Sequence, residues 1–212
     1  EQGVLHELPR KHVDTGMGFE RVCAVLQGKK SNYDSDVFMP VIDRIAEVTG
    51  QPYEGEQTQV AMRVIADHAR ATAFLVSDGV LPANEGRGYV LRRIMRRAVR
   101  YGKHLGLDKP FMEAVTQAVE QEMVNAYPHL KDSHSLLVKV ANNEEERFRE
   151  TLENGLALLD AEISRLEKAE SNVIPGPFIL SIVIHCLSPP CAKVPPSQEA
   201  PPSVDLNTSH KK

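Results

Sequence analysis

Residues 87–100 hold the side chains best suited to bind a polyanion. On a helix with about 100° per residue, the apolar side chains of this segment fall on one arc and the basic side chains on the other. Arg92, Arg96 and Arg100 follow one another at i, i+4 spacing, at which like charges repel each other. An external phosphate would relieve this repulsion, because the planar guanidinium donates two hydrogen bonds at once. The alternative, a solvated face whose arginines pair with acidic residues of neighbouring elements, stays open at this point.

A second candidate for anion binding is the pair Gly16 and Gly18, which stands just ahead of an amphipathic stretch at 19–27. The two glycines allow a sharp turn or a close approach of the backbone to a ligand. A helix that starts here would offer free N–H groups and the positive end of its dipole. Arg21 falls in the first turn, where the positive end of the helix dipole disfavours a cation. This makes Arg21 a candidate for binding an anion. Glycine pairs ahead of helices mostly form turns, so this pattern is weak evidence by itself.

Helical periodicity extends to about residue 170 and predicts the elements that carry these groups. We expect helices at 19–27, about 35–48, 60–76, the basic segment from 87, 110–126 and 135–170. A loop rich in turn-forming residues at 78–86 precedes the basic helix. From residue 171 the sequence becomes rich in proline and serine, which predicts a disordered tail.

Charged residues outside the basic segment suggest structural roles. Arg63, Asp67 and Arg70 lie on one side of their helix at i, i+4 and i+3 spacing, which predicts an ion-paired face. His68 has no second His or Cys at metal-ligand spacing, so we expect a structural histidine. The acidic run 144–146 predicts a solvated face of the last helix.

The composition narrows the class of protein. The chain has 212 residues and a formal net charge of −4 at pH 7, so a polyanion would have to meet a local basic patch. Cys23, Cys186 and Cys191 form neither a disulfide framework nor a metal-ligand spacing, which indicates reduced thiols. No apolar run is long enough to cross a membrane, and we expect no membrane partner. We expect a cytoplasmic protein, with an organelle as the alternative location, and a chain that is an internal fragment of something longer.

Several blocks of the sequence resemble one family. Residues 14–21 (Asp-Thr-Gly-Met-Gly-Phe-Glu-Arg) resemble motif 3 of class II aminoacyl-tRNA synthetases, in the form found in alanyl-tRNA synthetases. The blocks at 31–38, 63–70 and 77–84 and the basic helix resemble later parts of the same family, in the same order and spacing. The resemblance covers about residues 1–168.

This resemblance implies a mainly α fold with three parts. Residues 1–30 would be the C-terminal edge of a class II synthetase α/β catalytic domain that carries motif 3. Residues 31–170 would be a helical tRNA-recognition domain, and residues 171–212 a disordered, proline-rich tail outside the family.

For the chemistry, the resemblance implies part of an alanine–tRNA ligase. Such an enzyme activates alanine with ATP and Mg²⁺ and transfers it to the 3′ end of tRNA(Ala). Arg21 would stabilise the γ-phosphate side of ATP, Asp14 would accept the α-ammonium group of alanine, and Gly16 and Gly18 would leave room for the substrates. Motifs 1 and 2 are missing upstream, so we expect the chain alone to be inactive. We expect no metal site and no zinc.

The resemblance also assigns residues to the tRNA acceptor stem. Asn84 would read the G·U wobble pair from the shallow minor groove, in which RNA duplexes are read. The flanking phosphates would be held by Arg87, Arg92, Arg96 and Arg97. The family's partner aspartate would lie downstream, in the part that the proline-rich tail replaces.

Two other interpretations stay open. One is a non-catalytic helical module that binds RNA or DNA without ATP or alanine. The other is a helical scaffold whose arginines pair internally. The salt dependence of tRNA binding distinguishes a phosphate-binding face from a scaffold.

Overall fold

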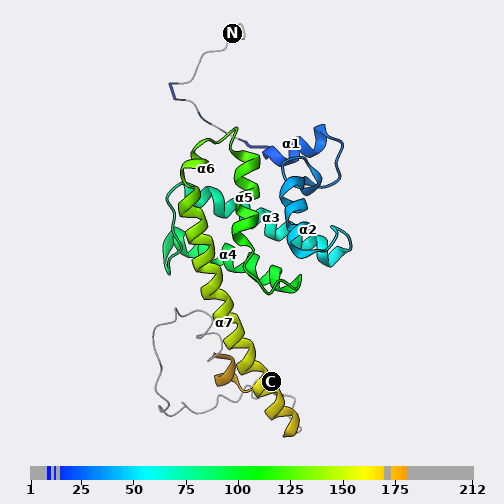
Figure 1. The fold of residues 1–212 in the computed structure, drawn as a ribbon, viewed down its shortest axis with the longest axis vertical. Coiled ribbons are helices and arrows are strands. Elements are labelled where there is room, and N and C mark those ends of the chain that lie inside the picture. Colours follow the sequence, from blue (N-terminus) through cyan, green and yellow to red (C-terminus); the bar gives the residue numbers. More distant parts are fainter. Residues whose placement is uncertain (1–8, 11, 13–14, 170–172, 181–212) are drawn as a thin grey trace, which may run out of the picture. The chain divides into compact units, whose positions relative to one another are not determined.

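The computed structural model describes residues 9–10, 12, 15–169 and 173–180 (Figure 1). Its elements are, in order, α1 (Phe19–Leu26), the 3₁₀ helix η1 (Asn32–Asp34), α2 (Met39–Thr49), α3 (Glu56–Ser77), α4 (Gly86–His104), α5 (Met112–Met123), α6 (His129–Asp132) and α7 (His134–Lys168). No strand occurs in these ranges, and the prediction of a mainly α chain is confirmed for them.

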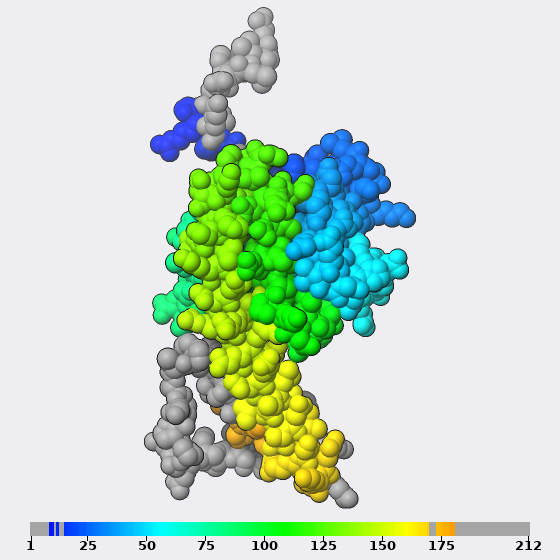
Figure 2. All heavy atoms as spheres, viewed as in Figure 1, coloured from blue at the N-terminus to red at the C-terminus, as the bar shows by residue number. Residues whose placement is uncertain are grey.

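The chain divides into two compact units, residues 1–145 and 146–212. In the first unit α3 packs against α2, α4 and α5, and α2 also packs against α5. Figure 2 shows the residues of α2 beside those of α5 on one face of this unit. Large apolar side chains of these four helices are completely buried and form the core: Ile42, Ile45, Met62, Ile65, Leu91, Met95 and Met112. Such a core fixes α4 by its apolar arc and leaves the opposite arc for other contacts.

The start of α2 differs from the prediction. The predicted helix began near Ser35, but the structure has η1 and a turn there and begins α2 at Met39. Ser35 is buried, and its hydroxyl donates to the carbonyl of Asn32 at 2.6 Å, so it closes the 3₁₀ turn and does not cap α2. The predicted end is confirmed, because Gly50 follows α2 with a left-handed φ of 66°.

Two residues of the acidic run 144–146 are buried, so the predicted solvated face is wrong there. Glu145 is 1% exposed and accepts hydrogen bonds from the backbone N–H groups of Phe111 and Met112 at the start of α5. Glu144 is 4% exposed and pairs with arginines of α4, and only Glu146 is exposed. Both buried carboxylates are satisfied by donors from other helices, which offsets their desolvation.

The charged residues on one side of α3 were predicted to pair with one another, but most of their partners lie outside α3. Arg63 lies 3.7 Å from the carboxylate of Asp34 and donates to the hydroxyl of Tyr53. Arg70 donates to Glu20 of α1. The partner of Asp67 is the neighbouring His68, whose Nδ1 lies 2.9 Å from the carboxylate, and this contact fits the structural role predicted for the histidine. Charges of α3 therefore tie other segments to this helix.

In the second unit α7 continues to Lys168, and a short helix covers residues 176–180. The amide of Phe178 donates to the carbonyl of Pro175 at 3.0 Å, and proline is compatible with the first turn of a helix. This short helix lies within the segment 171–212 that was predicted to be disordered. The other residues of that segment, 171–172 and 181–212, lie outside the described residues. Across the described helices, none has the length and hydropathy that crossing a membrane requires.

Candidate nucleic-acid interface

The helix α4 presents the basic segment as the sequence predicts. Its buried positions are Gly88, Leu91, Met95, Ala98, Val99 and Gly102, which repeat at helical spacing. Arg87, Arg93, Arg97 and Arg100 are exposed, whereas Arg92 and Arg96 are only partly exposed. The basic arc is therefore split into an outer row and an inner pair.

The loop that carries Asn84 lies directly on the first turn of α4. A Cβ atom added at Gly88 would lie 2.3 Å from the carbonyl oxygen of Leu81 and 2.6 Å from the Cβ of Ala83. Only glycine leaves room for a backbone approach this close. The absence of a side chain at Gly88 thus sets the distance between the loop and the helix.

The inner pair of arginines meets a carboxylate from α7. Glu144 Oε1 lies 2.8 Å from Nε of Arg96 and 3.3 Å from Nε of Arg92. The Arg92 and Arg96 side chains are 15% and 17% exposed, and the Glu144 side chain is 5% exposed. Arg92 also donates from Nη1 to Oδ1 of Asn84. For these two arginines an internal carboxylate offsets the mutual repulsion, as the scaffold interpretation expects.

The outer row combines arginine with tyrosine. The guanidinium of Arg93 lies 5.8 Å from the ring centre of Tyr89, and that of Arg97 lies 5.8 Å from the ring centre of Tyr101. Each pair is four residues apart, so the two side chains lie on the same side of α4. Cationic planes and aromatic rings are the groups on which nucleic-acid bases and phosphates bind. The sequence placed Arg93 on the basic arc without assigning it a tRNA contact, and it did not single out Tyr89 and Tyr101, although their spacing was visible there.

Gly16, Gly18 and Arg21, three of the residues that the resemblance assigns to ATP and alanine, lie just before α1 or in its first turn. Gly18 precedes α1 with a φ of 84°, which favours glycine, and Arg21 is exposed in the first turn. Gly16 is exposed, and Asp14 lies outside the described residues. A backbone hydrogen bond, and in addition the Arg70 guanidinium, lower the pKa of Glu20 against the opposing effect of burial. This ion pair ties α1, and with it Arg21, to α3.

The sequence matches the model of the family "tRNA synthetases class II (A)" over residues 1–182. The chain belongs to this family. Its relatives include the alanine–tRNA ligase of Anaeromyxobacter sp. (strain Fw109-5), which is 54% identical over 173 residues, or 81% of this chain and 19% of that protein. The alanine–tRNA ligase of Desulfosudis oleivorans is 49% identical over 181 residues, or 85% of this chain and 21% of that protein. The chain spans about a fifth of the length of the curated relatives that it matches.

In this member of the class II synthetases, the structure brings together Asn84, Arg92 and Arg96, and it places Arg87 and Arg97 on the same helix. It leaves Arg21, Gly16 and Gly18 in a separate region around α1. In the part of the chain that the structure describes, no cluster of His, Cys, Asp and Glu could hold a metal ion.

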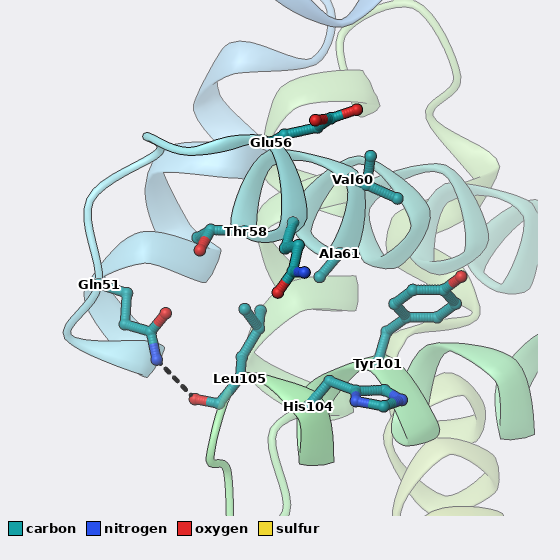
Figure 3. A pocket seen from close by; sticks show the side chains of 9 residues that line it. Gln51, Glu56, Thr58, Val60, Ala61, Tyr101, His104 and Leu105 are labelled. Atoms are coloured by element: carbon teal, nitrogen blue, oxygen red, sulfur yellow. Dashed lines mark hydrogen bonds between the residues drawn. The ribbon is translucent and has the colours of Figure 1, made fainter.

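A hollow of about 640 Å³ lies beside the end of α4 (Figure 3). It is lined by Gln51, Glu56, Gln57, Thr58, Val60, Ala61, Tyr101, His104 and Leu105. Gln51 donates from its side-chain amide to the carbonyl of Leu105 at 2.9 Å and so closes one side. The lining contains a carboxylate and neither lysine nor arginine, so this hollow does not suit a phosphate.

Proposed function

We propose that this chain is the part of an alanine–tRNA ligase that binds the acceptor stem of tRNA(Ala) through Asn84 and the outer arginines of α4. The observation that carries the proposal is the position of Asn84. Its amide is bonded to Arg92, at the start of a helix whose exposed side carries Arg87, Arg93 and Arg97. The names of the relatives support tRNA as the partner.

The two kinds of side chain would have different tasks. Exposed guanidinium groups of Arg87, Arg93 and Arg97 bind phosphates and position the duplex, but phosphates carry no sequence information. The amide of Asn84 both donates and accepts, so it can distinguish base edges. The minor groove of an RNA duplex is shallow enough for such a side chain to reach the G·U pair. Arg92 and Arg96, which Glu144 holds, leave most phosphate contacts to the outer row.

We propose that the activation of alanine is carried out by a full-length alanine–tRNA ligase of which this chain is a part. Residues 1–30 would form the edge of its catalytic domain, and residues 31–170 the tRNA-recognition domain. ATP with Mg²⁺ and alanine are its substrates, and Arg21 supplies a charge independent of pH for the γ-phosphate. Asp14 would pair with the ammonium group, and Gly16 and Gly18 would leave room for both substrates. We propose that Asp14, Gly16, Gly18 and Arg21 are only part of the activation site, so that the chain alone forms no alanyl-adenylate. We place the ligase in the cytoplasm.

A salt titration of RNA binding tests the proposal. The affinity of the chain for an acceptor-stem hairpin is measured by fluorescence anisotropy at several salt concentrations. Arg97→Ala should weaken binding and reduce the slope of log K against log salt by about one unit, because one phosphate contact is lost. The matched control is Arg44→Ala, which removes an exposed arginine of α2 that pairs with Glu47. If Arg97→Ala binds as well as Arg44→Ala, Arg97 does not contact a phosphate and the outer row is not the interface. If the wild type does not bind, the scaffold interpretation is correct.

A further inference from the structure

A continuous path of polar contacts joins α7 to the loop that carries Asn84. Glu144 Oε1 contacts the Nε atoms of Arg96 and Arg92 at 2.8 and 3.3 Å. From Arg92 the path continues through Nη1, which donates to Oδ1 of Asn84. All four residues belong to the first compact unit. The carboxylate of Glu144 therefore contacts Arg92, the residue that donates to the exposed amide of Asn84.

Burial makes the position of Arg92 depend on Glu144. Nε of Arg92 is shielded from solvent and has no partner with hydrogen-bond geometry, so the charge of Glu144 Oε1 is what stabilises it. A buried charged donor that loses its counter-charge is strongly unfavourable. Without the carboxylate, the guanidinium would have to turn toward solvent, and its contact with Asn84 would break.

The contact with Arg92 also fixes the orientation of the Asn84 amide. A guanidinium has only donors, so the oxygen of the amide has to face Arg92 and the nitrogen has to face away. The amide nitrogen and the second lone pair of the oxygen remain for a ligand. Asn84 itself is exposed and would otherwise turn between two amide orientations, because its terminal torsion has a broad two-fold preference.

We propose that Glu144 is a positioning residue for the reading of the acceptor stem: through Arg92 it fixes the Asn84 amide in the orientation that distinguishes G·U from a Watson–Crick pair. This inference rests on the proposed function. It assigns Glu144 an effect on specificity and not on the general affinity for RNA, because Arg92 and Arg96 keep their positive charge when Glu144 is neutralised.

The test compares two acceptor-stem hairpins that differ only in a G·U or a G·C pair. The wild-type chain should prefer the G·U hairpin about tenfold, a difference that one base contact can supply. Glu144→Gln should lose this preference and bind the G·C hairpin no more weakly than the wild type. The double variant with Asn84→Ala should have no lower preference than Asn84→Ala alone, since both changes remove one coupled interaction. Glu146→Gln, the same substitution at the exposed neighbour, should behave as the wild type.

Arg92→Lys provides a second variant in case Glu144→Gln folds poorly. A lysine can pair with Glu144 but lacks the planar fork that reaches Glu144 and Asn84 together, so preference should fall while thermal stability stays close to wild type. If Glu144→Gln retains the preference while Asn84→Ala loses it, the positioning role is wrong and the proposed function stands. If Glu144→Gln weakens binding of both hairpins equally, its role is only structural and the inference is overturned. If the wild type shows no preference, the role of Asn84 is wrong and the inference fails with it.

Discussion

Replacing Glu145 by glutamine should destabilise the first unit more than any exposed change on the same helix. The carboxylate is 1% exposed and accepts from two amides of the first turn of α5. The N–H of Phe111 lies 3.1 Å from each oxygen, and that of Met112 lies 2.9 Å from Oε2. Amides at a helix start have no partner within their own helix, so Glu145 supplies an acceptor that α5 lacks.

The magnitude follows from these contacts. A hydrogen bond to a charged group contributes about 1.5–3 kcal/mol, and an anion at a helix N-terminus adds up to about 1 kcal/mol. Glutamine has nearly the same shape and retains one acceptor oxygen, but it loses the charge and turns an NH₂ group toward an N–H donor. About half of the interaction is lost, so the free energy of unfolding should fall by about 2–4 kcal/mol.

Urea denaturation followed by far-ultraviolet circular dichroism measures this change. The control is Glu146→Gln, an identical substitution at an exposed position, which should alter the free energy of unfolding by less than about 0.5 kcal/mol. If Glu145→Gln is as stable as the control, the carboxylate does not serve as the acceptor for α5 and the reasoning is refuted.

Two further predictions concern the packing of α4 and the attachment of α1. Gly102→Ala should lower the free energy of unfolding by about 1–3 kcal/mol in the same urea experiment, although alanine favours helices, because the new Cβ would lie 2.2 Å from the ring of Phe111; a stabilised variant would contradict this. The pKa of Glu20 is lower in the folded chain than its unfolded value of about 4.5. The ion pair of Glu20 with Arg70 therefore stabilises the fold fully above about pH 4.5, and this stabilisation is lost as the pH falls through the folded pKa. The stability difference between the wild type and Glu20→Gln should therefore shrink below pH 4.5; a constant difference down to about pH 2 would show that the pair contributes nothing.

The sequence was informative wherever a property depends on local spacing. The apolar arc of α4 was predicted from its period, and Leu91 and Met95 are completely buried as expected. The end of the helix expected at about 35–48 was also predicted from a local pattern, and α2 ends at Thr49. Both depend on residues within one or two helical turns, which a single sequence displays directly.

The buried glutamates could not be predicted in this way. Glu144 accepts a hydrogen bond from Arg96, which is 48 positions away in the sequence, and Glu145 accepts from amides 33 and 34 positions away. A run of three acidic residues has the same appearance whether water or another helix satisfies it. For the same reason the sequence grouped Arg92 and Arg96 with the exposed arginines, and only the packing of α7 on α4 separates the inner pair from the outer row.

The role of Asn84 is tested most directly by one ratio, the affinity for a G·U acceptor-stem hairpin over that for a G·C hairpin, in the wild type and in Asn84→Ala. We predict a ratio on the order of ten for the wild type that falls to about one in the variant, while affinity for the G·C hairpin hardly changes. An equal loss of affinity for both hairpins would contradict it, because Asn84 would then only hold the loop on α4 and would not read the base pair.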